Sequence, residues 1–191
     1  MNRSEFKAYM KSLSWKEFLD KQKNEQSYYG VNLKSFLLLG DLCLIGLYLR
    51  HKRLCEYFLS KDNLVLKLVM GGNYLLMRWL ARINHFQIPL FLCEWGLRIP
   101  HYGTITMNGN ASVGKNLWIY PGSNIGEVRP GEDPIIGDNC YIGLNAVISG
   151  KVIVGDNAMI LPNAVVTKNV PANTIVGGVP AKAIRIKQTN Q

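Results

Sequence analysis

The feature that most constrains this chain is a period of six residues in its C-terminal half. An aliphatic residue recurs at every sixth position. A glycine follows this aliphatic residue in many of the repeats, and a small residue stands four positions after it in most of them. A hexapeptide of this kind is typical of a β-helix in which each six residues form one short strand and one side of a triangular coil. Three hexapeptides close one coil, so 136–153 and 154–171 are predicted to be complete coils. Every sixth position from 136 holds a β-branched aliphatic residue, without exception: Ile136, Ile142, Ile148, Val154, Ile160 and Val166.

The same period continues upstream in other phases, first through Ile99 and Ile105 and then from Val113 to Ile125. A solenoid extrudes extra residues as loops. We therefore expect a short loop before Val113 and a longer one at 127–134, "EVRPGEDP", beside the segment that carries His101. Glycine and asparagine in "GKN", "GDN" and "PNA" are expected to supply the corner conformations.

The first 82 residues follow a helical pattern instead. Ser14 and Glu17 have the spacing of a capping box, which predicts a helix start at that point. Apolar residues in 74–83 recur at helical intervals, and "GGN" at 71–73 is expected to interrupt the helices. We thus predict a mainly β protein: an N-terminal α-helical segment, 1–87, and a β-helix domain, 88–191, with the loop insertion at 127–134.

Composition and charge narrow the function classes. The hydrophobic fraction of 48% and charged fraction of 18% are typical of a folded globular protein. The net charge is +9, and residues 1–82 hold 14 Lys/Arg against 7 Asp/Glu, hence +7 of that total. The basic excess has three readings: a solvated helix surface, attraction to anionic substrates, or contact with an anionic membrane face. No recognition motif accompanies the charge, so nucleic acid is not an expected partner.

The cysteines and the N-terminus indicate a reducing compartment. Four cysteines without CxxC spacing predict buried thiols rather than a metal site or a disulfide framework. The N-terminus is polar and charged, unlike a secretory signal. The stretch 36–49 is the membrane candidate we find, but it has 14 residues and contains Asp41, whereas a span needs about 20 apolar residues. We expect a core-facing or surface-lying helix there and a cytoplasmic protein, with the inner face of the membrane as a hypothetical docking surface.

The segments "GLRIPHYGTITMNGNASVGKNLWIYPGSNIG" and "IGDNCYIGLNAVISGKVIVGDNAMILPNAVVTKNVPANTIVGGVPAKAI" resemble hexapeptide-repeat acyltransferases of the serine acetyltransferase-like branch. Within that branch the resemblance is to the short forms associated with capsule and surface-polysaccharide loci, and it covers roughly 88–186. It implies a left-handed parallel β-helix, a homotrimer, and acetyl-CoA as donor in a groove between subunits, with no metal.

The resemblance places His101 on the catalytic histidine of the family. A neutral imidazole can take the proton of an attacking hydroxyl and return it to the leaving thiolate. The other reading of His101 is a structural residue at a strand end. The residue before the family's histidine is an aspartate, and here it is Pro100. The aspartate that orients the histidine also has no clear counterpart, so we take Glu94 as the candidate.

In the family, an Arg-His pair binds the carboxylate of serine. Glu132 and Asp133 stand at the corresponding positions of this chain. Two anions do not hold a carboxylate, although Arg129 in the same loop is a possible substitute. We therefore expect an acceptor rich in hydroxyl groups, bound by Arg129, Glu132 and Asp133.

For CoA, the resemblance implies backbone contacts along the outer coil surface and basic side chains near the phosphates. Lys182 and Arg185, with Lys168 as a further candidate, would face the phosphates; an ordinary charged C-terminal strand is the alternative. Leu161 and Pro162 replace the usual Gly-Ala, which puts the contacts at that coil in question. The expected backbone contacts are Gly143, Leu144, Gly150, Pro162, Gly177 and Gly178.

These observations predict an acetyl-CoA-dependent O-acetyltransferase acting on a sugar hydroxyl of a surface polysaccharide or its precursor. Serine O-acetyltransferase, in cysteine biosynthesis, is the alternative with the same chemistry. A non-catalytic β-helix scaffold is the alternative from a different class.

Overall fold

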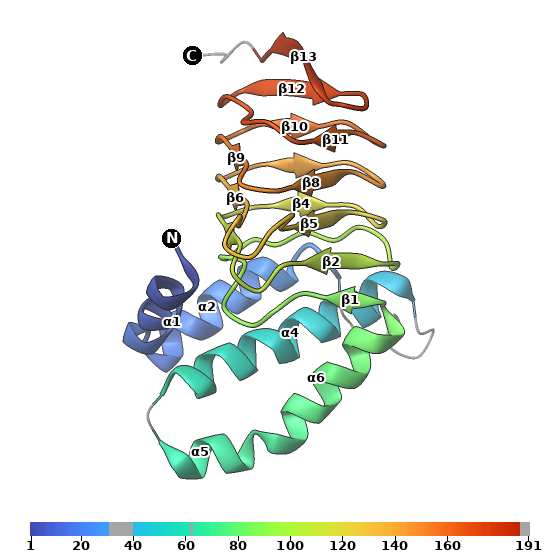
Figure 1. Cartoon of the computed structure of the whole chain (residues 1–191). Helices are drawn as coiled ribbons and strands as arrows, with labels where there is room; N and C mark the ends of the chain where they lie inside the picture. Colours follow the sequence, from blue (N-terminus) through green and yellow to red (C-terminus); the bar gives the residue numbers. More distant parts are fainter. Residues whose placement is uncertain (31–39, 62, 188–191) are drawn as a thin grey trace.

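The computed structural model describes residues 1–30, 40–61 and 63–187. Helices gather at one end of a column of stacked strands, and the described C-terminal residues lie at the far end of that column (Figure 1). The helices are α1 (Arg3–Ser12), α2 (Trp15–Gln26), α4 (Asp41–Ser60), α5 (Leu64–Val69) and α6 (Gly71–Ile83).

The strands build a three-sided parallel β-helix. Face 1 has the strand order β1-β2-β5-β8-β11, face 2 has β3-β6-β9, and face 3 has β13-β12-β10-β7-β4. All neighbours are parallel except β12 and β13, which are antiparallel and end the column. The first strand begins at Phe86, two residues before the expected boundary of the β-helix. The strands are β1 (Phe86–Gln87), β2 (Ile105–Met107), β3 (Ser112–Val113), β4 (Trp118–Ile119), β5 (Asn124–Gly126), β6 (Ile135–Ile136), β7 (Tyr141–Ile142), β8 (Val147–Ser149), β9 (Ile153–Val154), β10 (Met159–Ile160), β11 (Val165–Val166), β12 (Thr174–Gly177) and β13 (Lys182–Ile186).

The six-residue period is confirmed as the inward stack of the coil. Ile136 pairs with Val154 on face 2, Ile142 with Ile160 on face 3, and Ile148 with Val166 on face 1. All of these side chains are at most 2% exposed. Because each of these residues packs on the one 18 positions away, 136–153 is a complete coil, as predicted. The predicted length of the next coil, 154–171, was wrong: Val154 bridges to Val170 and Ile160 pairs with Val176, so that coil is two residues shorter.

The corners use asparagine and glycine for different reasons. Six asparagines adopt positive φ at corners, and the amide of Asn116 donates to Asn139 at 2.9 Å, so the asparagines also bond from coil to coil. The prediction for the glycines after the inward aliphatic residues was wrong. Gly143 is not in the left-handed region; a Cβ there would lie 2.6 Å from the backbone nitrogen of Pro162. This glycine permits close approach of the next coil rather than a turn.

The longer insertion lies at one edge of the prism. The loop 127–134 after β5 connects face 1 to face 2, which we call the 1–2 edge. The Asn108 amide donates to the Asp133 carboxylate at 2.8 Å and ties this loop to the preceding coil. The expectation of a short loop before Val113 was wrong: Met107 pairs with Ile125 and Val113 with Ile136, so the two extra residues lie earlier, between Ile99 and Met107, in the connection that carries His101.

The helical segment matches the sequence in part. Ser14 and Glu17 form the predicted capping box at the start of α2. Residues 41–49 lie in α4 and pack toward the core, as expected, whereas 36–39 fall outside the described residues. The helices are interrupted one residue earlier than expected: α5 ends at Val69, Met70 separates it from α6, and Gly71–Asn73 form the first turn of α6. All four cysteines are free and buried.

The prediction that 36–49 is the membrane candidate was incomplete. By length and composition alone, the helical stretch Leu64–Ile83 is long and apolar enough to cross a membrane. Our reading of the sequence split this stretch at the glycines and so overlooked it.

A buried ionic network joins the helices to the first coil. The Arg53 guanidinium contacts both oxygens of Glu25 at 2.8 and 2.9 Å and one oxygen of Glu56 at 2.8 Å. It also donates to the backbone carbonyls of Cys93 and Glu94, at 2.9 and 2.6 Å. Burial alone would raise the pKa of Glu56, but Lys52 and Arg53 outweigh it and hold that pKa below its ordinary value. The network therefore fixes α2 and α4 against the first turn of the β-helix.

Replacing Arg53 with methionine leaves two buried carboxylates without their shared cation. We expect the free energy of unfolding to fall by about 3–5 kcal/mol, measured by urea denaturation of the full chain at fixed concentration. Arg50→Met removes an exposed arginine from the same helix and should cost less than about 0.5 kcal/mol. Equal losses in the two variants would show that the network does not anchor the helices.

Candidate active site

His101 stands on the edge between face 3 and face 1, which we call the 3–1 edge. Arg98 bridges to Trp118 on β4, so Ile99 is in register with the inward Ile119. Gly103 is level with Pro121, since a Cβ on it would lie 2.9 Å from the Cβ of Pro121 and Thr106 pairs with Asn124. His101 therefore stands where this connection is two residues longer than the one in the next coil. His101 itself is exposed at this edge.

The segment before His101 is held by the helical part of the chain. The buried hydroxyl of Tyr29 donates to the Leu97 carbonyl at 3.1 Å and accepts from the Ile99 amide at 3.0 Å. Glu25 accepts from the amides of Gly96 and Leu97. Burial raises the pKa of the Tyr29 phenol, which therefore stays protonated as a donor. The position of His101 thus depends on residues about 70 positions earlier in the chain.

A row of aromatic rings runs from His101 along the coil. The His101 and Tyr120 ring centroids are 6.0 Å apart, and those of Tyr120 and Tyr141 are 5.3 Å apart. Partial burial and the neighbouring Tyr120 raise the pKa of Tyr141. We did not predict these tyrosines from the sequence. Their signal was available, since both stand next to an inward isoleucine and hence point outward.

Most of the residues expected to contact CoA line up along the same edge as His101, toward the C-terminal end of the column. Register places Leu144, Pro162 and Gly178 at successive levels of the 3–1 edge, with Gly143 and Gly177 one position before them. Leu144 is 44% exposed. Among the basic candidates, Lys182 pairs with Gly177 on β13, while Arg185 lies opposite Ile175, further across face 3. Gly150 and Lys168 do not join them, because they follow β8 and β11 at the 1–2 edge.

The acceptor loop is not beside His101 within one chain, contrary to our expectation. Arg129, Glu132 and Asp133 lie at the 1–2 edge, where the loop packs on Gly150, whereas His101 lies at the 3–1 edge. The reason is the period itself: the loop follows Ile125 on face 1, and His101 follows Ile99 on face 3. Face 1 therefore separates the histidine from the loop.

Glu94 does not orient His101. Cys93 bridges to Val113 on face 2, so Glu94 lies at the edge between faces 2 and 3. Its carboxylate is 3.3 Å from the Met1 amino group. Within the described part of the chain, no hydrogen bond reaches the His101 ring, and Tyr120 is its aromatic neighbour.

Comparison with known proteins agrees with this geometry. Residues 133–168 match the family described as bacterial transferase hexapeptide (six repeats). The 2,3,4,5-tetrahydropyridine-2,6-dicarboxylate N-acetyltransferase of Staphylococcus carnosus is 46% identical over 83 residues, which are 42% of this chain and 34% of that protein. Protein CapG of Staphylococcus aureus is 66% identical over 50 residues, 26% of this chain and 29% of that one. The chain thus spans about a third of the length of the curated relatives it matches.

Solved structures extend the likeness to the helices. Neisseria gonorrhoeae serine acetyltransferase superposes with a TM-score of 0.64 at 24% identity, covering 92% of this chain and 67% of that one. Brucella abortus serine acetyltransferase in complex with coenzyme A gives a TM-score of 0.55 at 24% identity, over 78% and 58%. These likenesses confirm the predicted fold, a left-handed parallel β-helix preceded by helices.

Removing the Tyr29 hydroxyl should loosen the segment that carries His101. Tyr29→Phe leaves the Leu97 carbonyl and the Ile99 amide without their partner, and we expect a loss of about 1–3 kcal/mol in unfolding free energy. Hydrogen exchange at the Ile99 amide should become faster. Tyr28→Phe, on the adjacent half-buried tyrosine, is the matched control and should change neither. Unchanged protection of Ile99 in Tyr29→Phe would disprove this anchoring role.

Proposed function

We propose that this chain is an acetyl-CoA-dependent O-acetyltransferase in which His101 is the general base. The observation that carries the proposal is the register of the 3–1 edge, where His101 heads the column formed by Leu144, Pro162 and Gly178. A thioester whose pantetheine lies along this column has its reacting carbon at His101. The likeness to acetyltransferases, one of them in complex with coenzyme A, supports the same donor.

The column suits a long, mostly apolar pantetheine arm. Exposed Leu144 and Val179 offer apolar contact. Pro162 is also exposed on this edge and adds a further apolar surface. Exposed Lys182 stands beside Gly177 at the far end of the column and provides a cation for the phosphates.

The proposed reaction is direct transfer without an acyl-enzyme. The acceptor hydroxyl attacks the thioester carbonyl, and the His101 imidazole takes its proton as the C–O bond forms. The C–S bond then breaks, and the protonated imidazole returns the proton to the CoA thiolate. General-base assistance of this kind is worth about 10²- to 10⁴-fold in rate.

A homotrimer completes the site in this proposal. In one chain, face 1 separates His101 from the loop 127–134, so the acceptor residues that serve a given histidine come from a neighbouring subunit. The half-buried carboxylates of Glu132 and Asp133 favour a polyhydroxylated acceptor, since they accept hydrogen bonds from sugar hydroxyls. We therefore propose a sugar of a surface polysaccharide or its precursor. Serine is the alternative, with Arg129 as the cation for its carboxylate.

The test of the proposed base is release of CoA thiol from acetyl-CoA with nucleotide sugars, oligosaccharides or L-serine as acceptor. His101→Asn should lower kcat by about 10²- to 10⁴-fold and leave CoA affinity unchanged. The matched control is His85→Asn, at an exposed histidine whose positive φ asparagine tolerates. Turnover with serine alone would replace the sugar acceptor. Full activity in His101→Asn would show that His101 is not the general base. A wild-type protein that neither binds CoA nor turns over any acceptor would favour the scaffold alternative.

A negative charge on the 3–1 edge should weaken donor binding. Leu144→Glu places a carboxylate in the proposed pantetheine path at an exposed site, and we expect the Kd for CoA to rise about tenfold or more by calorimetry. Ile153→Glu is the control on face 2, at a side chain that is 49% exposed compared with 44% for Leu144. Equal affinity in the two variants would place CoA elsewhere.

A further inference from the structure

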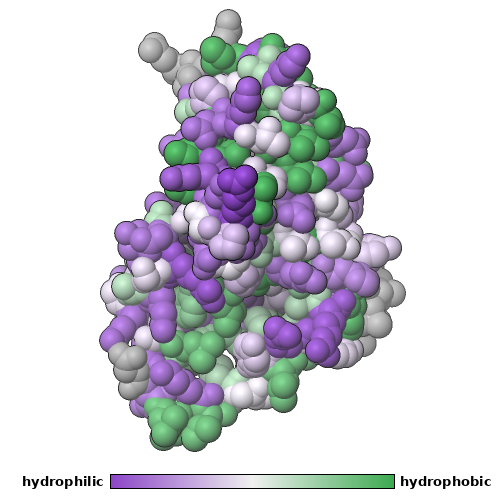
Figure 2. Space-filling view, in the orientation of Figure 1, coloured by the Kyte–Doolittle hydropathy of each residue, from purple (hydrophilic) through white to green (hydrophobic). Residues whose placement is uncertain are grey.

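The stretch Leu64–Ile83 leaves an apolar surface uncovered. Only 12% of its most apolar 18-residue window is buried, and Figure 2 shows hydrophobic side chains gathered over α5 at the lower tip of the molecule. Met77 and Leu80 of α6 are buried in the core, but the residues on the opposite arc are not. We call that arc the apolar face; its large exposed members are Leu64, Val65, Leu68, Leu75, Leu76, Trp79 and Ile83.

The charges in this stretch are all positive. Residues 64–83 contain no aspartate or glutamate, and their cations are Lys67, Arg78 and Arg82. At 100° per residue, Arg78 and Arg82 border the apolar face of α6 on one side, next to Leu75. Both arginines are exposed, and among the described residues neither has a hydrogen-bond or ion-pair partner.

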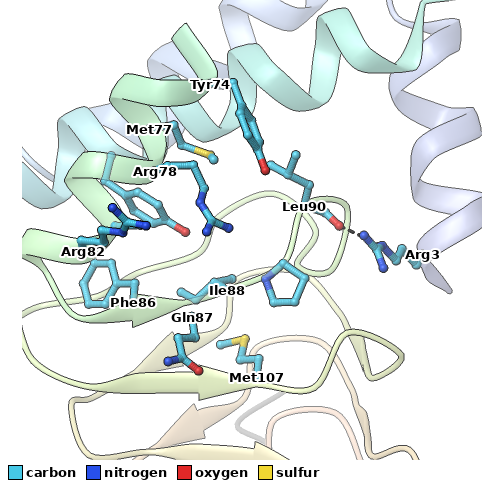
Figure 3. A pocket seen from close by; sticks show the side chains of 13 residues that line it. Arg3, Tyr74, Met77, Arg78, Arg82, Phe86, Gln87, Ile88, Leu90 and Met107 are labelled. Carbon is cyan, nitrogen blue, oxygen red and sulfur yellow. Dashed lines mark hydrogen bonds between the residues drawn. The ribbon is translucent and has the colours of Figure 1, made fainter. Parts of the chain in front are cut away.

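Beyond this arginine border lies a cavity of about 580 Å³ between α6 and the segment 86–90. Arg78 extends into it from α6, Arg82 lies above Phe86, and Arg3 approaches from the other side (Figure 3). Arg3 is tied to the Leu90 carbonyl at 3.0 Å. None of the described residues lining the cavity is acidic, and its floor is apolar, with Ile88 and Met107. Such a cavity suits a phosphate attached to an apolar group.

We propose that α5 and α6 dock this chain on the surface of an anionic lipid bilayer. The apolar face enters the boundary between headgroups and acyl chains, with Trp79 at the interface, and Arg78 and Arg82 bind lipid phosphates at the mouth of the cavity. The helices lie in the plane of the membrane rather than cross it, because Met77 and Leu80 hold α6 against the protein core. An apolar face bordered by cations and free of anions matches this occupant.

Docking by α5 and α6 would also place His101 near the membrane; what this means for catalysis rests on the proposed function. The Gly103 amide donates to the Asn84 carbonyl at 3.1 Å, directly after α6. The connection that carries His101 therefore lies at the docked end of the molecule. A sugar acceptor carried by a membrane lipid would reach the histidine there.

The test is co-sedimentation of the full chain with vesicles of phosphatidylcholine alone or mixed with phosphatidylglycerol. Wild type should bind the anionic vesicles. Leu75→Ser/Trp79→Ser and Arg78→Gln/Arg82→Gln should each weaken binding by about tenfold or more, and salt should weaken it further. The controls are Leu19→Ser, at an exposed leucine of α2, and Lys16→Gln/Lys23→Gln, which removes two charges from that helix. Both controls should bind like wild type.

Three results would overturn the proposal. Binding that ignores lipid charge or persists in both α6 variants would show that this surface is not the docking site. A lower molar mass of Leu75→Ser/Trp79→Ser in light scattering, with no vesicle binding by wild type, would assign the face to a contact between copies of the chain. Resistance to carbonate extraction would indicate a membrane span. Thiol release with a soluble acceptor should be the same in all variants, so failure of the docking is distinguishable from failure of the proposed function.

Discussion

The structure depends on one repeated constraint, the requirement that every sixth residue supply an aliphatic side chain to the interior of the coil. Ile142 and Ile160 are both fully buried, one above the other, and each pair of this kind fixes the vertical position of the residues on either side. Outward residues therefore form columns along the axis. His101, Leu144, Pro162 and Gly178 share an edge although 77 positions separate the first from the last, because the inward stack brings them into line. A long cofactor arm needs a surface of this kind.

The coil does not define the position of His101 by itself, because the histidine lies where the column begins. One side of that first coil has no coil below it and is completed by the helices. The Arg53 network and the Tyr29 hydroxyl replace the missing coil, binding the backbone of 93–99 with charged and phenolic groups. Buried ions are weak evidence for net stability, since desolvation offsets their attraction. Their value here is geometric: the carboxylates of Glu25 and Glu56 and the guanidinium of Arg53 accept and donate in fixed directions.

The sequence predicted the β-helix because its period of six is unlike that of any other strand pattern. It also predicted the capping box at Ser14, which depends on local spacing. Glu94 and the loop 127–134 were misplaced, since local spacing says how far a residue is along the chain but not which edge of the prism it occupies. Counting hexapeptides from Ile99 and Ile125 would have separated the two edges. The burial of Arg53 and the exposure of Trp79 could not be predicted, because both depend on how the helices pack against one another.

Transfer of acetyl along the 3–1 edge can be tested with a crystal structure of the protein with bound CoA. We expect pantetheine extended past Gly178, Pro162 and Leu144 and a thiol within hydrogen-bonding reach of His101. We also expect the loop 127–134 of a neighbouring subunit to face that thiol. CoA bound at another edge, or a thiol distant from His101 in an otherwise occupied site, would contradict transfer along this edge.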